Sequence, residues 1–187
     1  MEGEIVHAED KGDNRPPDFT LRPFHLYDID DFMVRATDDR ASRFLQWDTF
    51  VSREAALSYF KNRVLSHPWR RAICLQDRPI GAISVSPESA DNSQFRASIG
   101  YVLAPGYWGR GIATRAVKMV VSTIFDEFPQ LERLEAVADV ENPASQRVLE
   151  KAGFVREAVL RKYFILKGTP RDVVMYSLLA ADPKRLD

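Results

Sequence analysis

Hydrophobic and polar residues recur with two different periods along this chain, and each change of period marks a new element. Alternating or continuously apolar runs bounded by turn residues predict strands at about 19–24, 71–75, 79–85, 95–103 and 131–138. Apolar residues spaced three and four apart predict helices at about 28–36, 52–67, 111–128 and 142–152. Two closing strands, 154–166 and 171–180, are expected to flank a turn at 167–170.

This order of elements indicates one mixed α/β domain over residues 18–187, with no internal repeat or linker inside it. Residues 1–17 are polar and offer little to bury, so we expect them to form a mobile N-terminal arm. The length of 187 residues suits a single domain with ample room for a core.

Composition excludes several classes of function. The 26 Lys and Arg residues nearly balance the 27 Asp and Glu residues, and a formal charge of −1 argues against a dedicated nucleic-acid binder. Three histidines and one cysteine show no metal-ligand spacing, so no metal is expected. No apolar run approaches the roughly 18 residues of a membrane span, and the first residues do not read as a secretory signal. A cytoplasmic location is therefore expected.

The first segment with chemical content runs from Tyr101 to Ala116, where a predicted strand leads through a glycine-containing turn into a helix. Unpaired N–H groups and the helix dipole favour an anion at such a helix start. Glycines at 109 and 111 let a ligand approach the backbone, because no Cβ stands in the way. We therefore predict a phosphate site, with Arg110 and Arg115 close enough to add positive charge.

Two common phosphate motifs do not fit this turn. Gly106 and Gly111 have the spacing of a Walker loop, but Ile112 stands where that loop requires a lysine. Gly109 and Gly111 match part of the dinucleotide fingerprint, whose third small position holds Thr114. A nucleoside-triphosphate enzyme is thus disfavoured.

The second segment, residues 139–154, has the signals of a short capped helix. Asn142 is a strong N-cap, Pro143 suits the first helical position, and Gly153 fits a left-handed residue after the last turn. Taken alone, this segment needs no ligand.

Taken together and in this order, the two segments resemble the GNAT superfamily of acetyl-CoA-dependent N-acetyltransferases, and most of all its Rim-type branch, which acetylates protein N-termini. The resemblance runs from about Phe19 to Leu179. It is carried by Ile99-Gly100-Tyr101, by the turn at 107–114, by residues 142–154 and by Asp172-Val173-Val174-Met175-Tyr176-Ser177.

The resemblance implies a single GNAT domain and acetyl-CoA as co-substrate. Its mixed, mostly antiparallel sheet would have six to seven strands and about four flanking helices, and would splay open between the strands at 97–103 and 131–138. The backbone N–H groups of the turn would hold the CoA pyrophosphate: Gly109, Arg110, Gly111, Ile112, Ala113 and Thr114. The pantetheine would pair with the backbone of Val102 and Leu103 and lie beside Asn142.

Amine attack on a thioester needs a proton acceptor, a donor to the carbonyl oxygen and a group that stabilises the leaving thiolate. Many GNAT enzymes use a tyrosine as the acid, but Leu149 stands at its position. The Rim-type branch has a serine three residues after the Asn, which implies Ser145 as the catalytic acid. A strand N–H near Val102 would serve the carbonyl oxygen, and Tyr101 is expected to shape the acceptor pocket.

The general base is left open. A carboxylate often precedes the Ile-Gly-Tyr of the strand in this family, but this chain has Ser98 there. Glu135, Asp139, Glu157 or a chain of water molecules could replace it.

We therefore predict direct acetyl transfer from acetyl-CoA to a primary amine in a ternary complex, without a covalent enzyme intermediate. A protein N-terminal α-amine is the first acceptor by resemblance, and a small amine such as a polyamine or an amino sugar is the second. A CoA-binding module without catalysis is a further alternative, which Leu149 and Ser98 keep open. Neither a nucleic acid nor a membrane is an expected partner.

Overall fold

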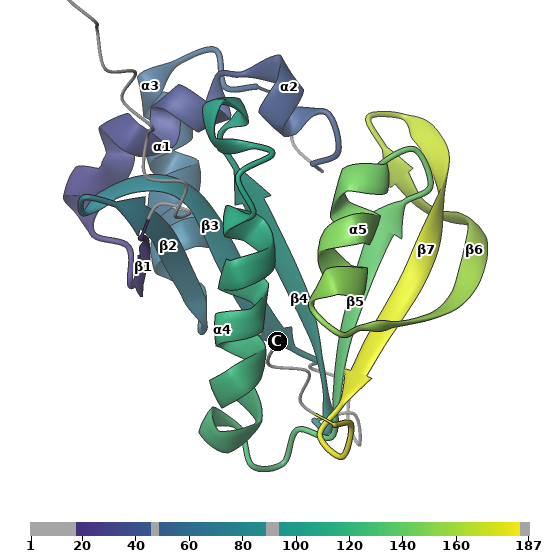
Figure 1. The fold of residues 1–187 in the computed structure, drawn as a ribbon. Coiled ribbons are helices and arrows are strands. Elements are labelled where there is room, and N and C mark those ends of the chain that lie inside the picture. Colours follow the sequence, from purple (N-terminus) through teal and green to yellow (C-terminus); the bar gives the residue numbers. More distant parts are fainter. Residues whose placement is uncertain (1–17, 46–48, 89–93, 184–187) are drawn as a thin grey trace, which may run out of the picture.

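A single twisted sheet organises the protein, as a computed structural model describes it for residues 18–45, 49–88 and 94–183. The predicted arm at 1–17 lies outside these residues. The strand order is β1-β2-β3-β4-β5-β7-β6, and every neighbouring pair except β4 and β5 is antiparallel (Figure 1). The strands are β1 (Thr20–Arg22), β2 (Arg70–Leu75), β3 (Arg78–Pro87), β4 (Arg96–Leu103), β5 (Arg133–Asp139), β6 (Val155–Leu166) and β7 (Thr169–Leu179).

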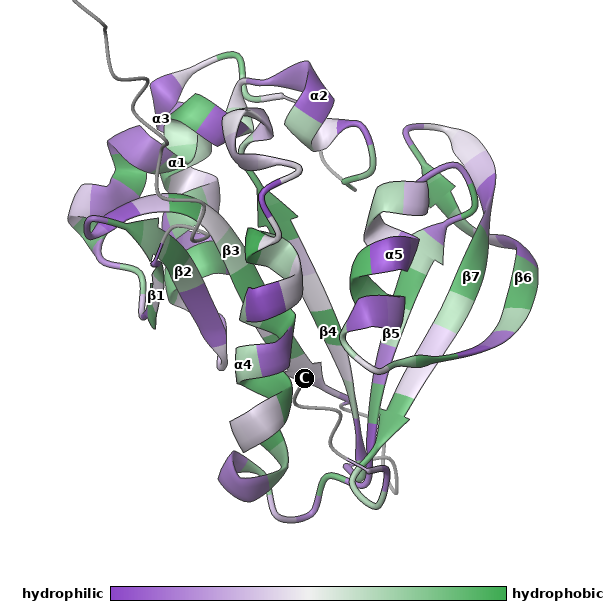
Figure 2. Ribbon diagram, in the orientation of Figure 1, coloured by the Kyte–Doolittle hydropathy of each residue, from purple (hydrophilic) through white to green (hydrophobic). Residues whose placement is uncertain are grey.

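Two helices, α4 (Ile112–Glu127) and α5 (Pro143–Lys151), cover one face of the sheet and enclose the main core (Figure 1). Hydrophobic and hydrophilic residues alternate along α4, as its amphipathic spacing predicts (Figure 2). Ile83 and Val85 of β3 join this core. Their neighbours Ala82 and Ser84 point to the opposite face, because successive strand residues alternate.

A second, smaller core lies over that opposite face. It is formed by α1 (Ile29–Ala36), α3 (Arg53–Tyr59) and the π-helical segment η2 (Phe60–Leu65), and α1 packs against β3. The rings of Phe32 and Phe60 lie 5.1 Å apart at its centre. Within the described ranges, no helix is both long enough and apolar enough to cross a membrane.

The predicted fold class is confirmed, and the differences from the predicted elements are local. The helix expected at 52–67 changes to π-helical hydrogen bonding at Phe60, which apolar spacing alone does not reveal. The short α2 (Asp39–Ser42) was not predicted, because its four residues show no apolar period. The expected turn at 167–170 shortens to Lys167-Gly168, both with positive φ, and Thr169 already pairs with Leu166.

Candidate functional site

The parallel strands β4 and β5 separate soon after they meet. Among the described residues they pair at Arg96–Arg133, Ala97–Leu134 and Ser98–Glu135, and at no later position. From there β5 continues beside β7, and β4 continues beside β3. The predicted splay is therefore present, and it leaves the β5-facing edge of β4 without a strand partner from Ile99 onward.

Backbone hydrogen bonds fix which β4 residues face this opening. The N–H of Ala104 donates to the carbonyl oxygen of Ile80 on the β3 side (2.8 Å), whereas the N–H of Arg133 donates to the carbonyl oxygen of Phe95 on the β5 side (3.0 Å). Successive residues of a strand direct their backbone groups to opposite edges. Odd-numbered residues of β4 therefore present their N–H and C=O groups to the splay.

The alternation of backbone directions along β4 corrects the prediction that Val102 pairs with the pantetheine. Val102 is even-numbered, so its backbone groups point to β3, away from the pantetheine that we expected them to pair with. Leu103 does face the splay, but its carbonyl oxygen already accepts a hydrogen bond from the indole Nε1 of Trp108 (2.9 Å). The backbone donors aimed into the opening are those of Tyr101 and Leu103.

The turn before α4 is built for close approach to its backbone. Gly109 (φ 74°) and Gly111 (φ 71°) both adopt the left-handed conformation that favours glycine, and Gly111 is the N-cap of α4. A Cβ built on either residue would meet nothing within 4 Å. Since Gly111 supplies no side-chain cap, the first N–H groups of this 16-residue helix remain for a ligand.

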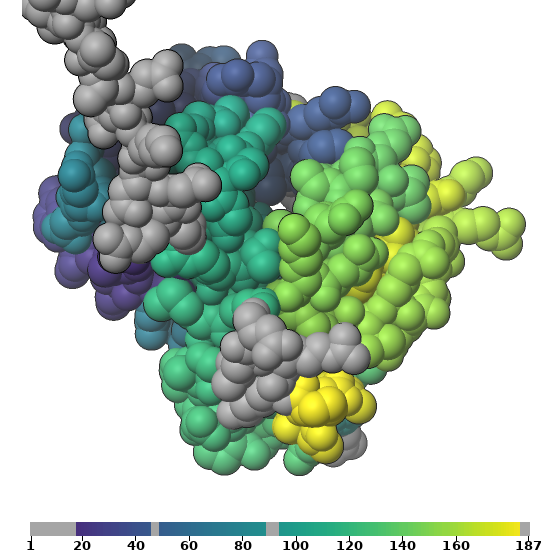
Figure 3. All heavy atoms as spheres, in the orientation of Figure 1, coloured from purple at the N-terminus to yellow at the C-terminus, as the bar shows by residue number. Residues whose placement is uncertain are grey.

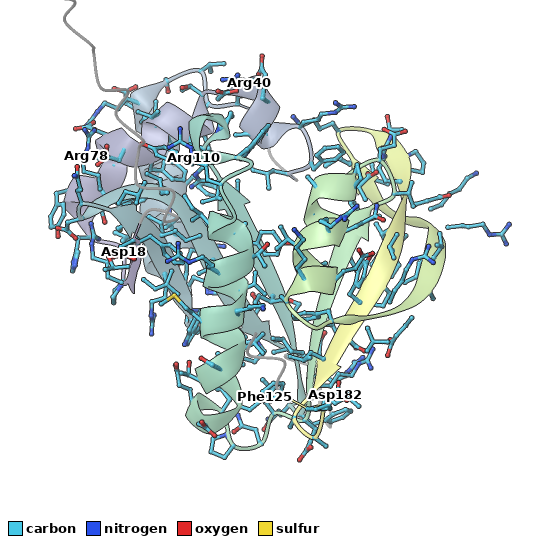
Figure 4. All side chains as sticks on the ribbon, viewed as in Figure 1. Asp18, Arg40, Arg78, Arg110, Phe125 and Asp182 are labelled. Atoms are coloured by element: carbon cyan, nitrogen blue, oxygen red, sulfur yellow. The ribbon has the colours of Figure 1, made fainter. Side chains whose placement is uncertain are left out.

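The two arginines expected to add charge to this turn point elsewhere. Arg110 lies with its guanidinium 5.5 Å from the ring centre of Tyr107 and does not line the cleft (Figure 4). Arg115 stacks over Phe19 (4.9 Å) and lies 3.7 Å from a carboxylate oxygen of Asp18. The positive potential at the turn therefore comes from backbone N–H groups rather than from these side chains.

A pair of hydroxyl groups bridges the splay. The Tyr101 hydroxyl of β4 lies 2.9 Å from Ser145 Oγ and donates to the Ser145 carbonyl oxygen (3.0 Å) in the first turn of α5. Asn142 caps that helix, its Oδ1 accepting from the Ser145 N–H (3.1 Å). Burial raises the pKa of Tyr101 well above its usual value, although the hydrogen bond to Ser145 acts in the opposite direction. The phenol therefore stays protonated at neutral pH.

The carboxylates proposed as bases are engaged by arginines. Arg171 binds Asp139 through two hydrogen bonds (2.7 and 2.9 Å) and holds its pKa below the usual range. Arg133 binds Glu157 in the same way (2.9 and 2.6 Å) and lowers its pKa to about 2, with help from Ser177. Glu135 accepts from Arg133 Nε at 2.6 Å. Carboxylates held like Asp139 and Glu157 are weak proton acceptors.

An open cleft of about 1200 Å³ occupies the splay. Figure 3 shows a groove on this face between the teal residues of β4 and α4 and the green residues of α5. Of the residues predicted to bind CoA or the acceptor or to act as the acid, all except Arg110 line the cleft: Tyr101, Val102, Leu103, Gly109, Gly111, Ile112, Ala113, Thr114, Asn142 and Ser145.

The sequence analysis missed two arginines in this cleft. Arg35 of α1 and Arg70 of β2 both line it, on the side covered by the second core. A signal for Arg35 was present, because it falls among the residues of the buried face of an amphipathic helix, three positions after Phe32 and one before Ala36. A charged residue at such a position is unusual in a purely structural helix.

Comparison with known proteins defines the class. The family model described as "Acetyltransferase (GNAT) domain" matches residues 18–155, and the chain belongs to this family of enzymes. It is 31% identical over 165 residues to the uncharacterized N-acetyltransferase YoaA of Bacillus subtilis strain 168, covering 85% of this chain and 92% of YoaA. The predicted family and enzyme class are thus confirmed.

Two relatives whose names state an acceptor cover different shares of this chain. The ribosomal-protein-serine acetyltransferase of Escherichia coli K12 is 29% identical over 138 residues, covering 71% of this chain and 75% of its own length. The spermidine N(1)-acetyltransferase of the same strain is 32% identical over 79 residues, covering 42% of each chain.

Solved structures show the same fold. A GNAT-family acetyltransferase from Bacillus anthracis superposes with a TM-score of 0.76 at 22% identity, covering 88% of this chain and 96% of that one. The microcin C7 self-immunity acetyltransferase MccE, solved with acetyl-CoA and AMP, has a TM-score of 0.74 at 22% identity and covers 86% and 92%. A structural neighbour thus holds the co-substrate that the sequence predicts for this chain.

Proposed function

We propose that this protein transfers the acetyl group of acetyl-CoA to the α-amine at the N-terminus of a protein, by direct attack in the cleft between β4 and β5. The observation that carries this proposal is the Tyr101–Ser145 hydroxyl pair beside the unpaired edge of β4. Acyl transfer needs hydrogen-bond donors at the acyl oxygen and at the leaving group, and this edge offers both within one cleft.

The residues of the turn fit a CoA pyrophosphate. The open space above Gly109 and Gly111, where a Cβ would stand, leaves the N-terminal N–H groups of α4 accessible to phosphate oxygens. The Leu103 N–H and the backbone of Tyr101 can pair with an extended amide chain in the splay, as a strand would. Asn142 lines the cleft beside them.

Bound acetyl-CoA supplies a thioester whose C–S bond breaks as the amine nitrogen forms the new C–N bond. A backbone N–H of Tyr101 or Leu103 faces the splay and can stabilise negative charge on the carbonyl oxygen. The Ser145 hydroxyl donates to the departing sulfur and is supported by the protonated Tyr101 hydroxyl behind it. The amine loses a proton to water, the departing sulfur gains one from Ser145, and Ser145 regains one from water, so both hydroxyls return to their starting state after each turnover.

Water is the acceptor that we propose for the amine proton. Asp139 and Glu157 are held by Arg171 and Arg133 at lowered pKa, so neither is a useful base. Glu135 sits at the closed end of the splay, opposite Ser98, and is hydrogen-bonded to Arg133.

The N-terminal α-amine is preferred over a polyamine for two reasons. The relative that modifies a ribosomal protein matches 71% of this chain, against 42% for the spermidine enzyme. The cleft is also lined by Arg35 and Arg70, whose positive charges disfavour a polycation. Spermidine remains the second candidate because of the spermidine relative.

The test is CoA release with acetyl-CoA and a panel of acceptors: peptides with free N-termini, the same peptides N-terminally blocked, spermidine and an amino sugar. We expect turnover with free N-termini only. Turnover with spermidine alone would favour the second candidate. Tight acetyl-CoA binding without turnover on any acceptor would favour a non-catalytic CoA-binding module.

A further inference from the structure

Arg35 is a buried cation that has no countercharge among the described residues. Its side chain leaves α1 toward the cleft and is 6% exposed. Within the part of the chain that the structure describes, its guanidinium forms no ion pair and no hydrogen bond, and it lies 5.1 Å from the centre of the Phe32 ring. A buried arginine normally has a carboxylate or several acceptors, because removing its charge from water is costly.

A second arginine, Arg70, brings a like charge close to Arg35. Burial lowers the pKa of Arg35 to about 10, and the like charge of Arg70 acts in the same direction. Arg70 donates to the carbonyl oxygen of Arg63 (2.9 Å) and lies beside the Tyr59 hydroxyl, but neither group is an anion. Both cations therefore line one cleft, and among the described residues neither forms an ion pair with a carboxylate.

The carboxylates of α1 cannot neutralise this pair, because they serve other partners. Asp30 binds Arg53 (2.7 Å) and Asp31 binds Arg78 (2.6 Å), both on the exposed side of the helix. Arg40, which also lines the cleft, is already paired with Asp38 (2.7 Å).

Strand register places Arg70 near Tyr101, where the reaction is proposed to take place. Arg70 lies opposite Ser84 on β3, and Ser84 lies opposite Gly100 on β4, next to Tyr101. Two strand spacings separate Arg70 from Gly100, which is about 10 Å. Gly100 and Ser84 carry little side-chain bulk here, since a Cβ on Gly100 would be in ordinary van der Waals contact with Ser84 Oγ at 3.8 Å.

We propose that Arg35 and Arg70 bind an anionic group, a carboxylate or a phosphate, on the acceptor whose amine is acetylated beside Tyr101. This inference rests on the proposed acetyl transfer and narrows its acceptor to amines that carry a negative charge a few bonds away. The planar guanidinium of Arg35 suits a bidentate contact with either oxyanion, and Phe32 holds it in place.

Matched acceptor pairs test the charge. The arms are Ala-initiated, C-terminally amidated tetrapeptides with Asp or Asn at position 2, 3 or 4, glycine against glycinamide, and phosphoethanolamine against ethanolamine. We expect kcat/KM to favour the anionic member of at least one pair by about tenfold or more. The pair that responds identifies the source as a peptide carboxylate, a small amino acid or a phosphate.

Variants then assign the preference to the residues. Arg35→Met is expected to lower kcat/KM for the preferred anionic acceptor by about 10- to 100-fold and to leave its neutral partner within about twofold. Arg35→Lys should recover part of the loss. Arg53→Met, which removes an exposed arginine from outside the cleft, is the matched control and should change neither rate.

Equilibrium binding of anions tests the anion site without relying on catalytic turnover. Calorimetry with succinate and with inorganic phosphate, in the presence of CoA, should show binding to the wild type that Arg35→Met abolishes. Equal use of both members of every pair, or an equal loss for both members in Arg35→Met, would overturn the anion site. Acetylation of small anionic amines but of no peptide would instead overturn the proposed N-terminal acceptor and leave the anion site standing.

Discussion

The hydroxyl of Tyr101 lies 2.9 Å from that of Ser145, although 44 residues separate them in the chain. One hydroxyl comes from the unpaired edge of β4 and the other from the first turn of α5, so the two meet only when the sheet opens between them. The fold thereby places a protonated tyrosine in the splay even though Leu149, at the position many GNAT enzymes give to a tyrosine, is buried in the core.

Removing the serine hydroxyl should slow the chemical step. We expect Ser145→Ala to lower kcat by about 100-fold and to leave the KM for acetyl-CoA nearly unchanged, because a proton donor to the leaving group acts in the transition state. Tyr101→Phe should lower kcat less, and adding it to Ser145→Ala should have little further effect, since the two groups act as one unit. Full additivity in this double-mutant cycle, or an unchanged kcat in Ser145→Ala, would contradict the shared role.

A single methyl group in the turn at 107–114 should weaken the binding of CoA. Gly111→Ala places a Cβ at φ 71°, which strains the backbone by roughly 1 kcal/mol, and it fills the space that a phosphate would enter. We expect the Kd for CoA to rise at least about tenfold, measured by calorimetry. Gly106→Ala is the control, since its Cβ also meets nothing but no left-handed φ is required there. Equal affinities in the two variants would remove the turn from the site.

Gly81 sets the distance between β3 and β4 next to the site. A Cβ there would come within 2.5 Å of the carbonyl oxygen of Val102 and of Leu103 Cδ2. Gly81→Ala should therefore destabilise the fold by roughly 2 kcal/mol, as overpacking does, and lower the midpoint of thermal unfolding. Gly100→Ala, whose Cβ has ordinary room, should unfold close to the wild type, and a midpoint for Gly81→Ala as high as that of Gly100→Ala would refute this close contact.

The Asp139–Arg171 pair should make stability depend on pH in a defined window. Arg171 holds the pKa of Asp139 below its usual range, so the stabilisation is fully present above the ordinary carboxyl pKa near 3.9 and is lost as the pH falls toward the folded value. We expect Arg171→Met to lower the unfolding midpoint at pH 7, with the difference from the wild type narrowing below about pH 4. Arg161→Met, on the exposed side of β6, is the control. A difference that stays constant down to pH 2 would show that the loss is not electrostatic.

Local signals in the sequence were enough for most of the fold and for the phosphate turn. The glycines at 109 and 111, the Asn142–Pro143 cap and the apolar spacing of α4 each specify their own backbone, so the elements and their order follow from them. The family resemblance added the splay, which the structure shows, and the role proposed for Ser145.

Properties that depend on three-dimensional register could not be predicted in the same way. The edge to which Val102 directs its backbone depends on how β3 and β5 pair with β4. The residues of β4 alone do not reveal whether the odd-numbered or the even-numbered ones face β5. Arg110 and Arg115 are near the turn in sequence, but their side chains reach Tyr107 and Phe19 instead. Arg35 and Arg70 come from different elements, and only the folded chain places them together.

The most direct test of the account is mass spectrometry of a free N-terminal peptide incubated with acetyl-CoA and this enzyme, with CoA release followed in parallel. The account predicts one acetyl group on the N-terminal nitrogen for each CoA released, no acetylated enzyme, and loss of both signals in Ser145→Ala. An acetyl group on a side chain only, an acetylated enzyme intermediate, or undiminished transfer by Ser145→Ala would contradict it.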